Sequence, residues 1–356
     1  MGRDWGGVRT LAWAIPEHTR AEVNAATKIW LDPAASEIDK AEALRIVNNW
    51  RGIHAFPLNT FQMGLRRRGS RLTGDLIVAQ RIKRLSSIEL KLRIRSSMKL
   101  TQMQDIGGCR AILEDVNQVR ELVKSFRRSD IKHKLLTEDD YIANPRDSGY
   151  RGMHLVYSYN SDRSTTYNGL KIELQLRSQL QHAWATSVEV VGTMVDQALK
   201  SSLGDPGWLR FFQLMSSELA RKEGEPLVPG TPDDLDVARS ELLLLVKEYN
   251  PVERLNAYSD ALNYIDNASA SDHFFLLHLK PRENTLVISA FKKKDSRLAN
   301  EQYLSIEKGI DISSDEEAVL VSVDSIAQLK RAYPNYFLDT KVFAEEVNRV
   351  CRLARR

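Results

Sequence analysis

Apolar and polar residues alternate most clearly in one short segment near the middle of the chain. Leu170, Ile172, Leu174 and Leu176 alternate there with Lys171, Glu173, Gln175 and Arg177. Because successive side chains of a strand point to opposite faces, the pattern predicts a strand with one apolar face and one polar face. The polar face would carry a carboxylate, an amide and two cations. A solvent-exposed sheet face gives the same pattern, so both interpretations stay open on the strand alone.

The rest of the chain to residue 222 predicts helices and short strands in alternation. The first ~60 residues have helical spacing, most clearly over Glu37–Trp50. Ser86 and Glu89 have the spacing of a capping box and predict that a helix starts there. Strands are predicted at 77–84, 103–113, 153–159 and 170–176, and further helices at 116–126, 179–200 and 208–221. We therefore expect an α+β domain built on a mixed sheet with flanking helices.

A second, smaller unit follows a segment rich in Pro and Gly. Glu223–Asp234 predicts the linker, and the apolar spacing of Leu255, Tyr258, Leu262 and Ile265 predicts a connecting helix. HFFLLHLK and TLVISAFK predict a hairpin, followed by a strand at 317–323 and helices at 325–332 and 339–352. The predicted organisation is a domain at 1–222, a linker at 223–234, connecting helices at 235–269, a β-rich unit at 270–338 and a terminal helix at 339–356.

Composition and charge narrow the class of protein. The chain has 356 residues, 42% of them apolar, which is enough for a packed core and two or three domains. Its net charge is +4, but residues 61–100 hold 11 Lys and Arg against only Asp75 and Glu89. Such a basic region favours a polyphosphate or RNA partner, although Arg66–Arg68 alone is typical of a solvated surface. With two cysteines, no membrane-spanning run and no signal peptide, we expect a cytoplasmic protein without a membrane partner.

The segment Asp140–His154 has the composition of a nucleotide-binding loop. Asn144-Pro145 favours a turn, and Ser148-Gly149 allows positive φ. Arg146 and Arg151 offer guanidinium groups for phosphate, while Tyr141 and Tyr150 offer rings on which a base can stack.

Two further clusters have the chemistry of a phosphate-transfer site. Asp105 lies near Gly107-Gly108 and Arg110, and together with Glu173 it could hold Mg²⁺ if their strands are neighbours. Strict alternation, however, puts Asp105 and Arg110 on opposite faces unless the glycines interrupt it. Arg81, Lys83, Ser87 and Lys91 predict a cationic wall for a triphosphate. His154 and His182 are ambiguous, because a lone histidine more often has a structural role.

Four segments, in this order, resemble the synthetase domain of the RelA/SpoT family. They are Arg81–Leu92, Gln104–Leu113, the Asp140–His154 loop and Ile172–Ala185. The resemblance covers roughly residues 60 to 220 and implies a nucleotidyltransferase-like fold. It also implies an ATP pyrophosphokinase, a transferase that moves pyrophosphate from ATP to a ribose 3′-hydroxyl.

The resemblance implies a role for each matching residue. Asp105 and Glu173 would be the catalytic carboxylates and the Mg²⁺ ligands, with Glu173 also activating the hydroxyl. The ATP-binding residues would be Arg81, Lys83, Ser87, Lys91 and Arg110. The acceptor-binding residues would be Arg146, Tyr150, His154, Gln175 and Arg177.

The C-terminal unit resembles that of the CapRel group of fused toxin–antitoxin proteins. It has no Cys, as in a pseudo-zinc-finger, and Tyr333 and Tyr336 match a regulatory Tyr-x-x-Tyr element of that group. The resemblance implies a toxin that modifies the 3′-terminal CCA end of tRNA, blocks translation and is inhibited by its own C-terminal unit. A phage structural protein would release the inhibition. Two alternatives stay open: a small alarmone synthetase with a guanosine or adenine nucleotide as acceptor, and a catalytically inactive sensor, against which the presence of Asp105 and Glu173 argues.

Overall fold

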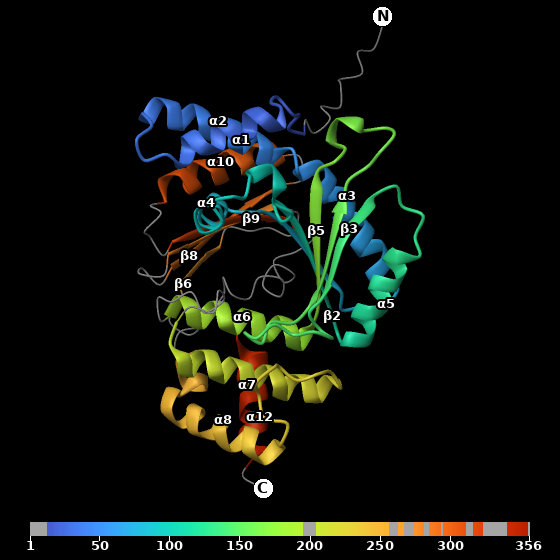
Figure 1. Ribbon diagram of the computed structural model, residues 1–356, viewed down its shortest axis with the longest axis vertical. Helices are drawn as coiled ribbons and strands as arrows, with labels where there is room; N and C mark the ends of the chain where they lie inside the picture. Colours follow the sequence, from blue (N-terminus) through green and yellow to red (C-terminus); the bar gives the residue numbers. More distant parts are fainter. Residues whose placement is uncertain are drawn as a thin grey trace, which may run out of the picture.

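One mixed β-sheet organises the molecule. The computed structural model describes residues 13–194, 204–255, 263–266, 274–280, 285–292, 295–310, 316–322 and 340–354. Within these ranges nine strands form a sheet in the order β3-β4-β5-β2-β1-β9-β7-β8-β6. Helices lie around it (Figure 1), so the predicted α+β class is confirmed. No helix among the described residues has both the length and the apolar character needed to cross a bilayer.

The N-terminal part of the chain contains most of the elements that its patterning predicts. The helices are α1 (Arg20–Leu31), α2 (Glu37–Gly52), α3 (Ala55–Gly69), α4 (Leu85–Ile94), α5 (Val116–Arg127), α6 (Gln179–Met194) and α7 (Pro206–Glu223). The strands are β1 (Ile77–Ile82), β2 (Gly107–Leu113), β3 (Lys134–Asp140), β4 (Met153–Ser158) and β5 (Lys171–Ser178). Strand β3 was not predicted, because this edge strand ends in the acidic run Glu138–Asp140 and lacks a clear apolar alternation.

The C-terminal part differs more from its prediction. It contains α8 (Leu235–Tyr249), β6 (Asn263–Asp266), β7 (Phe274–Lys280), β8 (Thr285–Phe291), α10 (Ser296–Gly309), β9 (Glu317–Ser322) and α12 (Lys341–Leu353). The predicted hairpin is confirmed, since β7 and β8 pair antiparallel. Ile265 lies in β6, parallel to β8, so the helical seam predicted through it is wrong. Helix α10 was missed, and Tyr333, Tyr336 and the predicted helix at 325–332 lie outside the described residues.

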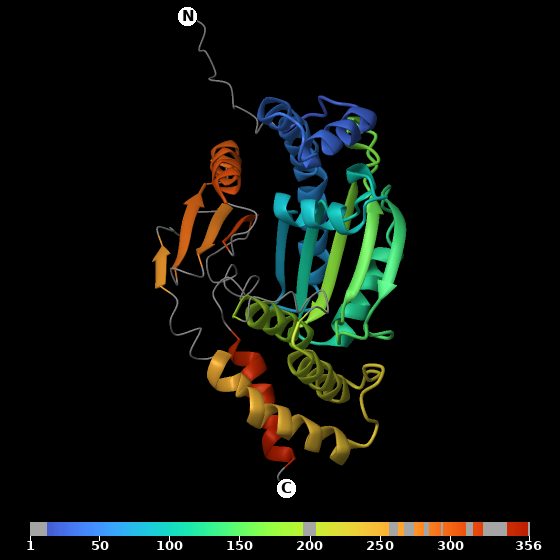
Figure 2. The same cartoon turned by 60° about the vertical axis from the view of Figure 1, so that its left-hand side comes forward.

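The C-terminal strands continue the sheet of the N-terminal part. Strand β9 pairs antiparallel with β1, with Arg81 opposite Val321. A hydrophobic cluster crosses this junction and includes Val191 of α6, Phe275 of β7 and Phe343 of α12. Figure 1 shows α6, α7, α8 and α12 gathered at one end of the molecule, and Figure 2 shows α12 beside α7 and α8. The two parts therefore share both a sheet and a core.

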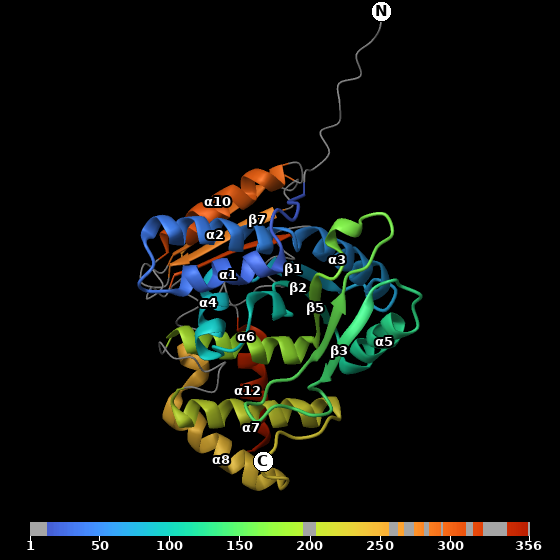
Figure 3. The same ribbon diagram turned by 45° about the horizontal axis from the view of Figure 1, so that its top comes forward.

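A second hydrophobic cluster covers the opposite face of the N-terminal strands. Helix α5 contributes Val119, Leu122 and Phe126, which repeat at helical spacing, and β5 contributes Leu174. Helix α10 forms a third, smaller cluster with β7, β8 and β9, and it lies beside α2 in Figures 1 and 3. The polar residues of β5 therefore lie on the face opposite the α5 core.

Candidate active site

The register of three central strands brings the predicted polar residues onto one face of the sheet. Strand β2 is parallel to β5, with Gly108 opposite Glu173 and Arg110 opposite Gln175. Strand β1 places Arg81 opposite Gly108. Since paired residues point to the same side of a sheet, these side chains share one face. Strand β2, which begins two residues after Asp105, and β5, which contains Glu173, are therefore neighbours.

Strand β4 and the loop before it complete a cavity of about 200 Å³ on this face. His154 pairs with Gln175 across the strands. Gly149 has a φ of 91°, as its sequence predicts, and a Cβ there would lie 2.9 Å from Trp184, so the loop packs closely on α6. The predicted residues that line the cavity are Arg81, Arg110, Arg146, Tyr150, His154, Gln175 and Arg177, while Trp184, Val188, Leu209 and Phe212 supply an apolar wall.

A hydrogen-bonded chain connects the loop tyrosine to the carboxylate of β5. Arg177 donates to the Tyr150 hydroxyl at 2.8 Å, and that hydroxyl lies 2.5 Å from His154 Nε2. His154 Nδ1 lies 2.9 Å from Glu173 Oε1, and Gln175 donates to Glu173 Oε2 at 2.7 Å. Protonated on both ring nitrogens, His154 donates to Glu173 through Nδ1 and to the Tyr150 oxygen through Nε2. Both oxygens of Glu173 are thus held in a fixed orientation.

The hydrogen bonds and charges in this series shift the pKa values of His154, Tyr150 and Glu173. Burial lowers the pKa of His154, but Tyr150 and Glu173 outweigh burial and raise it to about 9. Burial raises the pKa of Tyr150, yet Arg177 and His154 lower it to about 8. Burial also raises the pKa of Glu173, and the hydrogen bond from His154 brings it below its usual value. Glu173 is therefore ionised at neutral pH and can accept a proton.

The second carboxylate lies between two lysines. Asp105 lies just before β2, which begins at Gly107 rather than at residue 103, so strand alternation does not apply to it. Lys83 donates to its Oδ2 at 2.8 Å and Lys91 to its Oδ1 at 3.1 Å. Burial raises the pKa of Asp105, but the two lysines lower it below its usual value. Ser87 is half-buried in the first turn of α4.

These two carboxylates fit a magnesium–nucleotide complex better than a bare ion. All four oxygens already accept hydrogen bonds or ion pairs. In the described ranges, no group of three or more His, Cys, Asp or Glu is placed to hold a metal. The charge of Asp105 raises the pKa of Glu173, so the two carboxylates lie within electrostatic reach of each other. One or two carboxylates plus phosphate oxygens is the donor set that Mg²⁺ prefers.

Three predictions about local chemistry are wrong. Arg151 does not face the cavity: it is 3% exposed and donates to Ser216 Oγ and to the carbonyls of Ile142 and Pro226. Its role is to join the loop to α7 and the linker segment.

The other two corrections concern α4 and the basic region. Helix α4 begins at Leu85, and Glu89 pairs with Arg93 instead of forming a capping box with Ser86. Arg68 donates to Ser125 and lies over the ring of Phe126, so part of the basic region is used in packing rather than presented to a partner.

A buried cluster that was not predicted from the sequence lies beside Lys83. Arg51 of α2 forms an ion pair with Glu307 of α10 at 3.0 Å and donates to the Tyr303 hydroxyl at 2.9 Å. Arg51 also donates to the carbonyl of Lys83. The spacing of Ala299, Tyr303, Ile306 and Ile310 is helical and could have revealed α10, but no local signal connects it to Arg51.

A family profile described as "Region found in RelA / SpoT proteins" matches residues 80–190. Residues 80–190 are therefore similar to this region of RelA and SpoT proteins, and we call them the RelA/SpoT domain. That domain contains every residue predicted here for catalysis, ATP binding or acceptor binding, from Arg81 to Arg177. Arg51 and Glu307 lie outside the matched range.

Known proteins resemble the RelA/SpoT domain over part of their length. GTP pyrophosphokinase YjbM of Bacillus subtilis is 35% identical over 115 residues, which is 31% of this chain and 52% of YjbM. GTP pyrophosphokinase YwaC of the same organism is 26% identical over 112 residues, 30% of this chain and 52% of YwaC. The chain thus spans about half the length of these relatives. The crystal structure of the small alarmone synthetase 1 of Bacillus subtilis bound to pppGpp aligns at 24% identity with a TM-score of 0.41, over 47% of this chain and 88% of that chain.

Proposed function

We propose that the RelA/SpoT domain transfers pyrophosphate from ATP to a ribose 3′-hydroxyl. The observation that carries this proposal is the position of Glu173, an ionised carboxylate held by His154 and Gln175, two residues that line the cavity. A cavity of this kind provides what phosphate transfer needs, namely fixed positive groups and an oriented base.

Lys83 and Lys91 bind the triphosphate in this proposal. In the absence of nucleotide they neutralise Asp105, and phosphate oxygens are an alternative set of acceptors for the same ammonium groups. Arg81 and Arg110 lie on the neighbouring wall and add positive charge. Mg²⁺, held by Asp105 and Glu173 together with the phosphates, would reduce the charge of the triphosphate.

Glu173 takes the proton of the attacking hydroxyl. A bond forms between the ribose 3′-oxygen and the β-phosphorus of ATP, the bond from that phosphorus to the α-phosphate oxygen breaks, and AMP leaves. Gln175 and His154 keep the carboxylate oriented during this step. Tyr150 presents its ring to the cavity, where an acceptor base can stack, and Arg177 holds its hydroxyl.

The acceptor that we propose is the 3′-terminal CCA end of tRNA. The exposed members of the basic region, such as Arg67, and the exposed Arg146 of the loop favour a polyanionic substrate. A guanosine or adenine nucleotide is the second candidate, and the relatives named GTP pyrophosphokinase favour GDP or GTP.

One labelling experiment separates these acceptors. The full chain carrying Tyr333→Ala, which should be released from the proposed inhibition, is incubated beside the wild type with [γ-³²P]ATP, Mg²⁺, tRNA and GDP, and the products are resolved by gel electrophoresis and thin-layer chromatography. Label on full-length tRNA, lost when the terminal adenosine is removed, supports the tRNA proposal. Label on GDP would replace it with the alarmone proposal. If neither acceptor is labelled by the Tyr333→Ala variant, and that variant binds ATP, the inactive sensor is favoured.

The C-terminal unit would act as the antitoxin, released by a phage structural protein in the cytoplasm. The pairing of β9 beside Arg81 supports a regulatory connection between this unit and the ATP-binding residues. Tyr333→Ala, with Tyr336→Ala as its companion, should cause growth arrest without a trigger. Point substitutions are the better test, because truncation after residue 270 would also remove β9 and the part of the shared core that lies in β7 and α12.

A further inference from the structure

The turn between β1 and α4 carries the nucleotide-binding residues of the proposed site. Strand β1 ends at Ile82, and α4 begins at Leu85. Lys83 lies in the turn, while Ser87 and Lys91 lie on the helix that the turn orients. Arg84, at the N-cap position, does not cap the helix with its side chain. The first N–H groups of α4 therefore need an acceptor from elsewhere.

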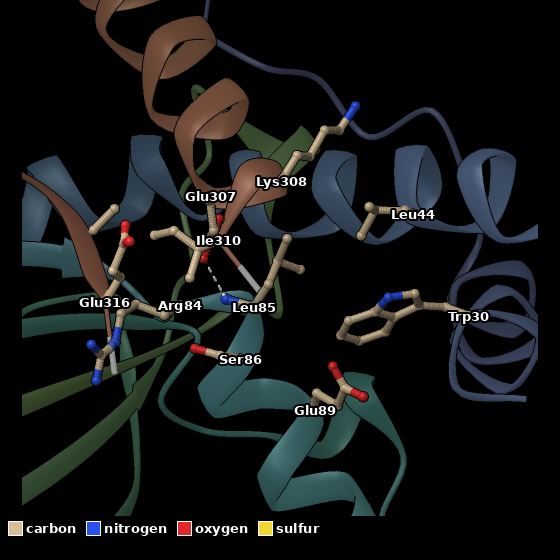
Figure 4. Close-up of a pocket in the computed structure, with 11 residues that line it drawn as sticks. Trp30, Leu44, Arg84, Leu85, Ser86, Glu89, Glu307, Lys308, Ile310 and Glu316 are labelled. Atoms are coloured by element: carbon tan, nitrogen blue, oxygen red, sulfur yellow. Dashed lines mark hydrogen bonds between the residues drawn. The ribbon is translucent and has the colours of Figure 1, made fainter. Parts of the chain in front are cut away.

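Helix α10 supplies that acceptor. Glu307 Oε1 accepts a hydrogen bond from the backbone N–H of Leu85 at 2.6 Å, as Figure 4 shows. A carboxylate at this position satisfies a helix N–H and interacts favourably with the positive end of the helix dipole. Glu307 is separated from Leu85 by 222 residues, so the cap of α4 comes from the other end of the chain.

Arg51 connects the same carboxylate to the other end of the turn. Its Nε and one terminal nitrogen donate to the carbonyl of Lys83 at 3.1 and 2.9 Å. Its other terminal nitrogen lies 3.0 Å from Glu307 Oε2. The side chains of Arg51 and Glu307 are only 2% and 7% exposed, so water does not replace these contacts. The Lys83 carbonyl and the Leu85 N–H are thus both fixed by one buried ion pair.

We propose that Glu307 and Arg51 are positioning residues of the ATP-binding site. Helix α10 caps α4 and fixes the Lys83–Leu85 turn, so it belongs to the nucleotide-binding machinery as well as to the C-terminal unit. The inference rests on the proposed ATP-dependent function, since it assigns a purpose to the geometry of Lys83, Ser87 and Lys91. It implies that a chain lacking α10 binds ATP poorly, even with the inhibitory segment removed.

The first experiment replaces the cap. Glu307→Ala should accelerate amide hydrogen exchange at Leu85 and Ser86 by about tenfold or more, because the capped N–H loses its acceptor. Its affinity for the α,β-methylene analogue of ATP with Mg²⁺ should fall by about tenfold, since the turn loses its fixed geometry. Glu307→Gln keeps a carbonyl acceptor and should recover part of both losses. The matched control is Glu301→Ala on the same helix, where the side chain is 59% exposed and pairs with Arg297, and it should change neither readout.

A second variant keeps the inference testable if Glu307→Ala unfolds. The double change Arg51→Met with Glu307→Leu replaces the ion pair by apolar side chains of similar size, which folded proteins tolerate well. The double variant should recover the melting temperature of the wild type while amide exchange at Leu85 stays fast and the analogue affinity stays low. If stability and analogue affinity recover together, the pair is only structural and the inference is wrong.

The outcomes separate this inference from the proposed function. Unchanged exchange at Leu85 in Glu307→Ala would overturn the capping role. Fast exchange with unchanged analogue affinity would overturn the positioning role. If the wild type bound no ATP analogue at all, the proposed function would fail first, and the positioning role would fail with it, whatever the exchange at Leu85.

Discussion

The two sides of the site are built in opposite ways. On the acceptor side, which comprises Tyr150, His154, Glu173 and Arg177, all contacts arise within 28 residues of the chain and on two adjacent strands and their loop. On the ATP side, which comprises Lys83, Lys91 and Asp105, the turn that carries Lys83 is held by Arg51 and Glu307. Arg51 comes from α2, 32 residues before Lys83, whereas Glu307 comes from α10, 222 residues after Leu85.

The two sides of the site therefore depend on different parts of the molecule for their geometry. The acceptor side depends on hydrogen bonds inside the RelA/SpoT domain and should respond to changes there alone. The ATP side also depends on a buried ion pair that crosses to the C-terminal part of the molecule. Substitutions can therefore test whether the two sides fail separately.

The largest expected effect is on the acceptor side. Glu173→Gln removes the base and should lower the transfer rate by about 10² to 10⁴, as expected for the loss of a general base. The affinity for the ATP analogue, measured without Mg²⁺, should stay within about twofold, because Lys83 and Lys91 are unchanged. Single-turnover kinetics and equilibrium binding measure the two quantities. Glu138→Gln on β3, away from the cavity, is the control; an equal loss of rate and ATP affinity in Glu173→Gln would show that the two sides are not separable.

The next largest expected effect is on the stability of the protein and concerns the ATP side. Arg51→Met should lower the free energy of unfolding by about 3 to 5 kcal/mol, because it leaves the Glu307 carboxylate buried without its cation. Arg297→Met removes an exposed pair and should cost less than about 1 kcal/mol. Urea denaturation of both variants gives the comparison. If Arg51→Met lowered the free energy of unfolding by less than about 1 kcal/mol, the ion pair would not be important for stability.

The pH dependence of stability sharpens the description of the acceptor side. The pKa of His154 is raised to about 9, so its protonated form contributes stability that is complete below its ordinary pKa of ~6.5 and is lost as the pH rises through about 9. The difference in unfolding free energy between wild type and His154→Gln should therefore shrink by about 1 to 3 kcal/mol between pH 6 and pH 10. Urea denaturation across this range measures it. A difference that grows with pH would reverse the assigned direction.

The smallest effect isolates the hydroxyl of Tyr150. Tyr150→Phe keeps the ring but loses the link between Arg177 and His154, and should reduce kcat by about tenfold with little change in the acceptor KM. Tyr150→Ala removes the ring as well and should raise the KM. Equal kinetics for the two variants would remove the distinction between stacking and hydrogen bonding.

Local pattern was sufficient to predict the strand that contains Glu173 and the loop that contains Tyr150. The alternation from Lys171 to Arg177 predicted the polar face of β5, and the turn residues predicted the loop with Gly149 at positive φ. What the alternation could not predict was the pairing of neighbours, because register depends on hydrogen bonds between distant segments. Only the structure places His154 opposite Gln175.

The support of the ATP side could not be predicted in the same way. The pair Ser86 and Glu89 has the spacing of a capping box, but Glu89 pairs with Arg93 and the cap comes from Glu307. Arg51 directly follows the helix predicted at Glu37–Trp50, and no local pattern indicates that it is only 2% exposed. The prediction that Arg151 binds phosphate was wrong for the same reason, because local spacing does not encode burial or long-range partners.

The long separation between Leu85 and Glu307 has a consequence for synthesis of the chain. A ribosome adds about 5 to 20 residues per second, so the helix start at Leu85 waits on the order of 10 to 40 seconds before the carboxylate of Glu307 is made. During that interval α4 has no cap from α10, Arg51 has no counter-charge from it, and β1 has no neighbour from β9. A nascent chain therefore carries a turn before α4 that is still without its cap, and this turn is completed only after α10 has been translated.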